Sequence, residues 1–289
     1  MASLSHQLDV ALQARSFEPD FHSFKAYAFA ERPTAVSNER GLYLGFDLHP
    51  NPQWSITGYF DQYYYPANKY QAYFPSRGNE QLLQIQYKIR RGTHVYLRFR
   101  ADNKEVNARE ELPGIQLSRL IPTRRLQGRI HFQTKLSNSL TLRSRLELSS
   151  WQRGYSTQPE ERSNGFLFYQ DVSWKPGFKF RFTGRLALFD AEDYDARIYA
   201  YENDILGFFS IPPYYGRGTR MYGIIGLFTL PLYGPLDTLC AHPPARPAAG
   251  WRRLLQRRNR RGLPVFGSGL ESHAGAARDE IKLQLRLKF

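Results

Sequence analysis

Apolar and polar residues alternate along most of this chain with a period of two. The last nine residues show the pattern without interruption, in the run Ile281-Lys-Leu-Gln-Leu-Arg-Leu-Lys-Phe289. Successive side chains of a β-strand point to opposite faces, so this run has one apolar face and one cationic face. The pattern predicts a β-strand, and no helical periodicity of comparable length competes with it elsewhere in the chain.

Ten further segments are predicted to be strands, and most of them alternate in the same way. They are 8–14, 42–48, 54–60, 83–90, 95–100, 126–133, 140–148, 166–174, 178–188 and 221–230. One more strand is expected within 234–245. The visible total is then about twelve strands, with a range of roughly 10–14, and an even number is usual for bacterial barrels.

The connections between these segments alternate between short and long. Short turns containing Pro, Gly or Asn are predicted at 49–52, 90–93, 137–139, 175–177 and 232–235. Long connections are predicted at 16–40, 62–79, 102–123, 152–164, 190–218 and 234–279. The alternation requires that 23–31 and 195–211 be excursions within long loops. Such sorting is typical of an up-and-down outer-membrane barrel, with periplasmic turns and extracellular loops.

The composition of the chain agrees with strands that have one apolar face and one solvated, polar face. Aromatic residues make up 15% of the chain, yet its mean hydropathy is -0.54, and no run approaches the length of a transmembrane helix. Trp54 and Trp174 adjoin short turns, where barrels carry interfacial aromatic residues. Leu285, Leu287 and Phe289 are the expected assembly signal of a closing strand. We therefore predict an all-β fold, an up-and-down antiparallel transmembrane β-barrel over 1–289, with an amphipathic soluble sheet as the alternative.

Cations gather on the face opposite the apolar one. In a barrel they would line the interior, because a charge on the lipid face costs about 2–4 kcal/mol at mid-depth. The basic lumen candidates are Arg98, Arg100, Arg129, Arg143, Arg145, Arg181, Arg185, Lys282, Arg286 and Lys288. A basic lumen attracts anionic solutes. The alternative is that these side chains pair with acids and simply fill the barrel.

Residues 234–266 break the alternation. They contain seven Arg, with Asp237 as their single acid, in a chain whose formal net charge is +14. One interpretation is a basic helix that binds anionic lipid or nucleic acid. The preferred hypothesis is translation in a shifted frame between compensating indels near Asp237 and Phe266. Reading one nucleotide later permits Thr-Leu-Tyr-Ala-Arg-Ile-Arg-Gln, which alternates like the other strands.

The first ten residues lack the basic and apolar regions of a signal peptide. An outer-membrane protein needs such a peptide for export. We therefore expect the chain to be an N-terminally truncated fragment that begins inside a longer gene.

The residue pattern gives little support for enzymatic or metal chemistry. The seven His have no metal-ligand spacing, and a single Cys provides no disulfide framework. His131 is expected to face inward, but no Ser motif accompanies it. We expect no catalytic residue, no metal and no cofactor. The alternative functional class is a soluble, basic, all-β protein that binds nucleic acid or an anionic ligand.

Five motifs resemble the barrel portion of outer-membrane proteins from Bacteroidota-like bacteria that contain a helix-hairpin-helix segment. They are Asn38-Glu-Arg-Gly-Leu-Tyr-Leu-Gly45, Asp193-Tyr-Asp-Ala-Arg-Ile-Tyr-Ala-Tyr-Glu-Asn-Asp204, Ser210-Ile-Pro212, Gly216-Arg-Gly-Thr-Arg220 and Asp279-Glu-Ile-Lys-Leu-Gln-Leu-Arg-Leu-Lys-Phe289. The resemblance covers most of 16–289, apart from 237–266. The family's helix-hairpin-helix segment would precede Met1, so no nucleic-acid role is carried over.

These observations together lead us to expect a porin-like or transporter-like protein of a Gram-negative outer membrane. Its expected partners are outer-membrane lipid, lipopolysaccharide and the barrel-assembly machinery. No nucleic-acid partner is expected for this part of the chain, and the sequence does not identify a transported substrate.

Overall fold

The structure is a computed structural model in which every described element of regular structure is a β-strand. It describes residues 2–22, 29–31, 36–112, 115–155, 158–177, 180–204, 209–227, 248–256, 265–266, 273–274 and 277–284. Side chains are not described at 109–118, at 155–160 or from 227 onward. The prediction of an all-β fold is confirmed. The described residues include no helix that is long and apolar enough to cross a membrane.

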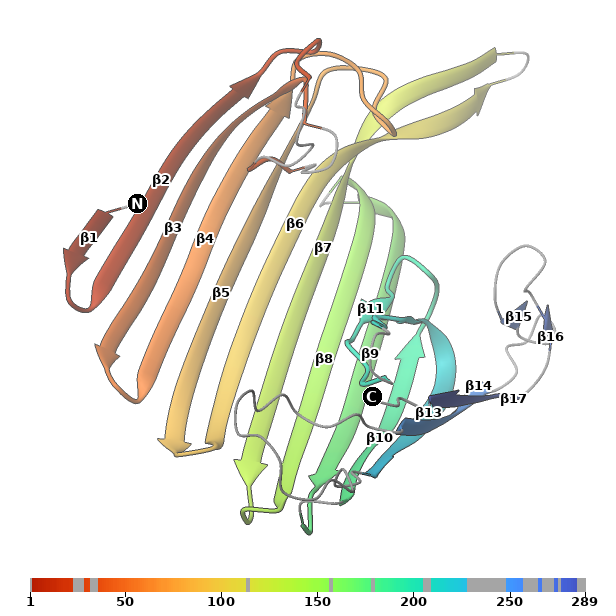
Figure 1. The fold of residues 1–289 in the computed structure, drawn as a ribbon. Coiled ribbons are helices and arrows are strands. Elements are labelled where there is room, and N and C mark those ends of the chain that lie inside the picture. The colour runs from red at the N-terminus through yellow and green to blue at the C-terminus, as the bar shows by residue number, and fades with distance from the viewer. Residues whose placement is uncertain are drawn as a thin grey trace, which may run out of the picture. The chain divides into compact units, whose positions relative to one another are not determined.

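One sheet contains most of these strands, paired in the order β1-β2-β3-β4-β5-β6-β7-β8-β9-β10-β13-β14-β17 (Figure 1). Their bounds are β1 Ala2–Ser5, β2 Leu8–Phe17, β3 Glu39–Asn51, β4 Trp54–Tyr65, β5 Ser76–Arg90, β6 Thr93–Leu112, β7 Ile115–Lys135, β8 Leu140–Tyr155, β9 Gln158–Trp174, β10 Phe180–Ala191, β13 Gly216–Leu227, β14 Ala248–Gln256 and β17 Ala277–Gln284. Two short pairs are separate, namely β11 Ile198–Tyr199 with β12 Pro213–Tyr214, and β15 Val265–Phe266 with β16 His273–Ala274.

The strand order confirms the up-and-down layout. Short connections follow β1, β3, β5, β7 and β9, and long ones follow β2, β4 and β10. Because β10 pairs directly with β13, the described part of 195–211 is an excursion within a loop, as predicted. Likewise β2 pairs directly with β3, although 23–28 lie outside the described residues. β1 and β17 stand at the two ends of the order, and no pairing that would close a barrel is found among the described strands.

Three of the predicted long loops are wrong, namely 102–123, 152–164 and 234–279, the last of which contains β14. Strands β6 and β7 continue through most of 102–123, and strands β8 and β9 continue through most of 152–164. These stretches lose the apolar alternation that marks a strand. The backbone pairing nevertheless continues. Polar cross-strand contacts accompany it at the start of the first stretch, such as the 2.8 Å bond from Asn103 Nδ2 of β6 to Asn79 Oδ1 of β5.

The irregular segment 234–266 also contains a strand. β14 pairs in register with β13 and β17, so the interpretation of a basic helix is wrong for 248–256. Backbone pairing with two neighbours forms this strand although its side chains do not alternate. Residues 228–247 and 257–264, and with them the short turn predicted at 232–235, lie outside the described part of the chain. The frameshift hypothesis stays a prediction.

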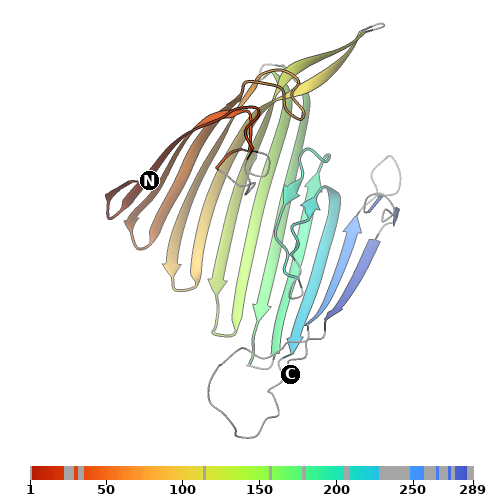
Figure 2. The same ribbon diagram turned by 45° about the horizontal axis from the view of Figure 1, so that its top comes forward.

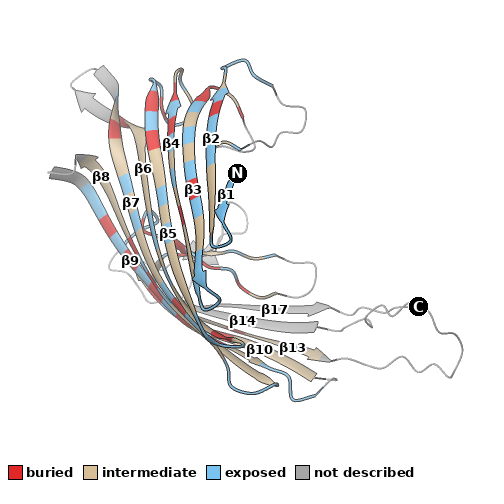
Figure 3. Ribbon diagram, turned by 90° about the vertical axis from the view of Figure 1, so that its left-hand side faces the viewer, coloured by how far each residue is buried: buried red, intermediate tan, exposed pale blue. Residues whose placement is uncertain are grey.

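Exposed positions alternate with intermediate or buried ones along the strands (Figure 3). Many of the exposed positions are large and apolar, which is the reverse of a soluble sheet. One face of the strands carries large apolar side chains that are 36–66% exposed. This exposed apolar face comprises Leu12, Leu42, Leu44, Phe46, Phe60, Leu83, Leu97, Phe99, Leu126, Ile130, Phe132, Leu146, Leu148, Phe166, Phe168, Leu186, Leu188 and Ile225. The alternate positions form the charged face, which includes the buried ionisable residues Arg15, Glu39, Asp171 and Arg185.

The chain divides into two compact units. The first comprises 1–89, 95–130 and 148–164, and the second comprises 90–94, 131–147 and 165–289. In the second unit, the connection that contains β11 and β12 packs against β9 and β10 (Figure 2). This contact buries an apolar cluster of Leu167, Tyr169, Ala187, Phe189, Ile198, Ala200 and Tyr214. The cluster lies on the charged face of the strands, opposite Phe166, Phe168, Leu186 and Leu188.

Candidate functional site: the charged face of the sheet

Arg185 is the centre of the charged face in the second unit. It stands in β10, in register with Asp171 of β9 and with Tyr222 of β13. Directly paired residues of an antiparallel ladder share one face of the sheet, so the three side chains meet there. Arg185 is only 5% exposed and Asp171 only 4%.

The Arg185 guanidinium uses its donors on both the sheet and the loop. Nε and Nη2 donate to Asp171 Oδ1 and Oδ2 at 2.5 and 2.8 Å, and Nη1 donates to the Tyr201 carbonyl at 2.6 Å. The group also lies 3.7 Å from the ring centroid of Tyr169. This planar, two-pronged pairing holds the charge in one orientation and fixes the long connection to the sheet.

A second ion pair joins the same connection to β13. Glu202, which is fully buried, accepts a hydrogen bond from Tyr214 Oη at 2.5 Å and lies 3.1 Å from Arg220 Nε. The Asn203 backbone N–H donates to Tyr222 Oη at 3.0 Å. The connection therefore covers part of the charged face and is held there by charged and polar contacts as well as by the apolar cluster.

The first unit contains a comparable cluster around Arg15 of β2. Nε donates to Glu39 Oε1 at 2.5 Å, and Nη1 and Nη2 donate to the two carboxylate oxygens of Asp61 at 2.7 and 3.0 Å. Gly41 is paired with Arg15 in the ladder, and a Cβ there would lie 2.6 Å from Arg15 Cζ. The glycine therefore makes room for a buried guanidinium between two carboxylates.

Glu31, in the long connection after β2, extends this cluster. Its backbone N–H donates to both oxygens of Glu39, at 3.0 and 3.1 Å, and its carboxylate accepts bonds from Tyr65 Oη and Lys104 Nζ, each at 2.8 Å. Burial acts to raise the pKa of the Glu31 carboxyl, but Lys104 and the hydrogen bonds outweigh it, so the pKa lies below its ordinary value.

The structure describes the side chains of seven of the ten predicted lumen cations. Arg98 donates to Gln84, Arg100 to Glu80 at 2.7 Å and Arg143 to Gln133 at 2.9 Å. Arg145 lies 5.1 Å from the Tyr169 ring centroid, and Arg129 and Arg181 are partly exposed. Arg185 is the most deeply buried of the seven.

The remaining predicted residues are not described at the level of side chains. Lys282 belongs to β17, where only the backbone is described. Arg286, Lys288 and the assembly signal Leu285, Leu287 and Phe289 lie outside the described residues. Their roles stay predictions.

Sequence reasoning missed several residues of these clusters. The sequence pattern could have predicted Arg15 on the charged face, because this residue continues the polar positions of the alternating segment 8–14. No sequence pattern predicts Glu31 or Glu202, because both stand in connections without periodicity. The charged face thus offers buried, oriented cations with carboxylate partners and loop segments folded against it, an arrangement suited to binding or excluding charged solutes.

Comparison with known proteins gives no family assignment. No protein-family model matches the chain, and no curated protein matches it. The resemblance to outer-membrane proteins with a helix-hairpin-helix segment therefore stays a prediction.

Removing one partner of the buried pair tests the Arg185 cluster. We expect R185M to lower the free energy of unfolding by about 3–5 kcal/mol, because it leaves the Asp171 carboxylate buried without its counter-charge. The double variant D171N/R185M should recover part of that loss. Urea midpoints of the folded protein measure both effects, and an R185M midpoint equal to that of the wild type would contradict the assignment.

The pKa of Glu31 gives a pH-dependent test. A carboxyl with a lowered folded-state pKa contributes stability that is present above the unfolded value and is lost as pH falls through the folded value. The free energy of unfolding of the wild type should therefore exceed that of E31Q by about 1 kcal/mol near neutral pH. That difference should vanish in acid. The control is E18Q, because Glu18 is 64% exposed in a 3.6 Å surface pair with Arg40; an equal pH dependence in both variants would count against the buried role of Glu31.

Proposed function

We propose that the protein is a bacterial outer-membrane β-barrel protein, with a porin-like or transporter-like function and a basic interior. The observation that carries this proposal is the reversed burial of the strands. Large aliphatic and aromatic side chains are exposed on one face, whereas Arg15, Glu39, Asp171 and Arg185 are buried on the other. A barrel in a bilayer needs this inversion, because lipid solvates the apolar face and the interior holds the charges.

Strand length supports the same function. A tilted strand of about 9–11 residues crosses the hydrocarbon core of a bilayer. The strands from β2 to β10, together with β13, have between 10 and 21 residues. Each is long enough to span, and the longest would extend beyond the membrane surface.

Aromatic residues at the strand ends also support it. Trp54 begins β4 and packs against Tyr87 with ring centroids 4.7 Å apart, and Trp174 ends β9 and contacts Phe180 at 5.9 Å. Each tryptophan adjoins a short turn, is at least 40% exposed and lies on the apolar face. Amphipathic rings at such positions are typical of the interfacial girdles of membrane barrels.

The alternative function is a soluble basic protein that binds nucleic acid or another anion. Its support is the net charge of +14. A soluble sheet would have to cover its apolar face with another layer, and none covers that face among the described residues. The partners that follow from the proposed function are outer-membrane lipid, lipopolysaccharide and the barrel-assembly machinery.

A substitution that places a charge on the exposed apolar face distinguishes the membrane function from the soluble alternative. Leu44 is 48% exposed in the middle of β3. We expect L44R to lose about 2–4 kcal/mol of folding free energy in lipid vesicles, because the guanidinium would face hydrocarbon. Heat-modifiable migration and urea midpoints measure this loss. In a soluble protein the same substitution would be nearly neutral.

The matched control for L44R is Q13R, which adds the same charge on the charged face near Asp61. Gln13 pairs with Tyr43, and Tyr43 pairs with Asp61, so the three share one face. Q13R should fold like the wild type. If L44R folds as well as Q13R, and the chain is a soluble monomer without detergent, the membrane proposal is wrong.

The basic interior makes a separate prediction about conductance. In planar bilayers we expect wild type to form anion-selective channels, because cations outnumber acids on the charged face. Among the described residues, Arg143 donates to the neutral Gln133 amide and forms no ion pair, so R143Q should lower the ratio of anion to cation permeability. R143K keeps the charge and should keep the ratio. Cation selectivity of the wild type would contradict the basic-interior assignment.

A further inference from the structure

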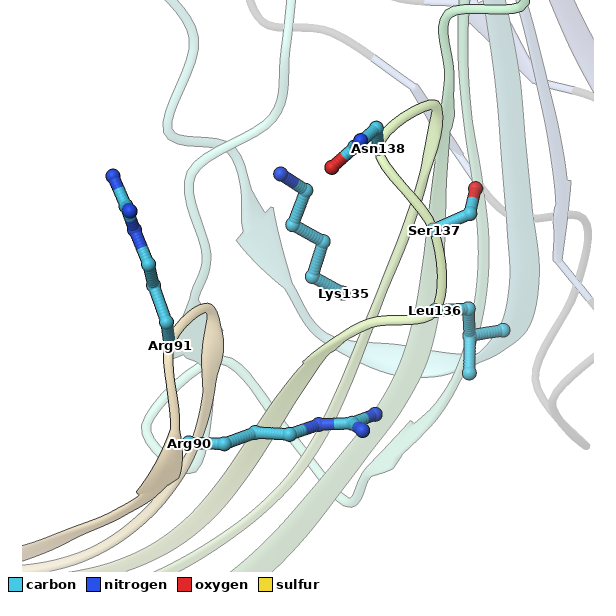
Figure 4. A pocket seen from close by; sticks show the side chains of 6 residues that line it. All are labelled: Arg90, Arg91, Lys135, Leu136, Ser137 and Asn138. Carbon is cyan, nitrogen blue, oxygen red and sulfur yellow. The ribbon is translucent and has the colours of Figure 1, made fainter.

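A basic pocket lies between two turns of the second unit. It has a volume of about 650 Å³ and is lined by the β5–β6 turn and the β7–β8 turn (Figure 4). Its lining residues are Arg90, Arg91, Lys135, Leu136, Ser137 and Asn138. Three of these side chains are cationic, none is acidic, and Ser137 and Asn138 add neutral polar groups. The lining therefore supplies positive charge and hydrogen-bond donors without a counter-charge of its own.

These cations have different partners from the buried cations in the middle of the strands. Arg15 and Arg185 are held in buried ion pairs. Arg90 instead donates to the neutral hydroxyl of Thr93 at 3.3 Å. Arg91 and Lys135 form no ion pair with any described residue. Cations that no neighbouring acid offsets direct their field into the pocket and concentrate anions there.

Close packing and hydrogen bonds of the two turns fix the shape of the pocket. Gly92 has a φ of +80°, and a Cβ at this position would lie 2.9 Å from Lys135 Cβ, so the glycine lets the first turn approach the end of β7. The hydroxyls of Thr93 and Thr134 are 3.2 Å apart and link the two strands. Ser137 Oγ accepts the backbone N–H of Leu140 at 3.1 Å and orders the second turn. A preformed site loses less entropy when a ligand binds.

The apolar face ends at this pocket. Ile89 precedes Arg90 and is 49% exposed, and Leu136 follows Lys135 and is 55% exposed. Arg90 and Lys135 stand at charged-face positions, because neighbouring side chains of a strand point to opposite faces. The two faces meet at this edge of the sheet, where β5 and β7 end, so an amphiphile with an anionic group and an alkyl chain can reach both the cations and the apolar residues there.

We infer that this pocket binds a phosphate group. Phosphate oxygens accept several charge-assisted hydrogen bonds at once, from the fork of an arginine and from the ammonium of a lysine. In a bilayer the phosphate is that of an anionic phospholipid headgroup, whose acyl chains lie along the exposed apolar face. The lipid source rests on the proposed membrane function, whereas the phosphate site itself does not.

The test compares lipid retention by the refolded full chain. Wild type is folded into phosphatidylcholine vesicles with and without phosphatidylglycerol, extracted into detergent, and the retained lipid is measured by native mass spectrometry. We expect preferential retention of phosphatidylglycerol, and R91Q/K135Q should weaken it by about fivefold, since each exposed ion pair contributes modestly. The charge-conserving variant R91K/K135R should retain it. The control R40Q/R77Q removes the same charge from the first unit and should bind like the wild type.

A second arm titrates the folded chain with inorganic phosphate in solution. Phosphate binding that R91Q/K135Q loses supports the pocket even if phosphatidylglycerol is not preferred, and it then identifies free phosphate as the source. If wild type inserts into vesicles but neither prefers phosphatidylglycerol nor binds phosphate, the inference is overturned and the proposed function stands. If the chain does not insert, the proposed function fails and the phosphate titration alone decides. Equal losses in R91Q/K135Q and R40Q/R77Q would show a general charge effect and overturn the site.

Discussion

The exposed apolar face is the constraint on which the rest of this structure depends. Removing a Leu, Ile or Phe side chain from water contributes about 1.5–3 kcal/mol. The face carries eighteen such side chains that are at least a third exposed. Even at half of that gain for each, the cost of leaving them in water would equal or exceed the net stability of an ordinary domain, which is about 5–15 kcal/mol. Under the proposed function lipid covers this face, and the charged groups gather on the other face.

Charges gathered on one face must satisfy one another, and both units do this in the same way. In each, a buried arginine stands between neighbouring strands and directs its fork at a carboxylate, and a long connection folds back to complete the cluster. The Glu31 backbone and side chain extend the cluster of Arg15, and the Tyr201 carbonyl accepts a hydrogen bond from Nη1 of Arg185. A buried ion pair alone contributes little net stability, because desolvation offsets the attraction. What these clusters provide is a fixed geometry. Moving Arg185 would leave the Asp171 carboxylate buried without its counter-charge, and moving Arg15 would remove the cation that Glu39 and Asp61 share.

Sequence periodicity predicted the part of this structure that local chemistry determines. The alternation of 178–188 assigns Arg185 to the charged face, and the same rule extends to Arg15, because the side-chain period of a strand is two. Periodicity failed for 102–123 and 152–164, where the strands continue although apolar and polar residues no longer alternate in the sequence. Periodicity also did not predict the contacts of Glu202, because the partner of a loop residue depends on how the loop folds. The identity of Asp171 as the partner of Arg185 required the register of β9 against β10, which two separate alternating segments do not specify.

Position along a strand, more than residue type, decides what a cation does in this fold. Arg185 and Arg91 carry the same group. The first lies in the middle of a strand, where two neighbouring strands and a folded loop surround it and supply its counter-charge. The second lies in a turn beside Gly92, where the strands have ended and no described acid reaches it. Cations in mid-strand therefore organise the charged face, whereas the cations of the two turns have no acidic partner among the described residues and, under the proposed phosphate site, are the ones that meet a ligand.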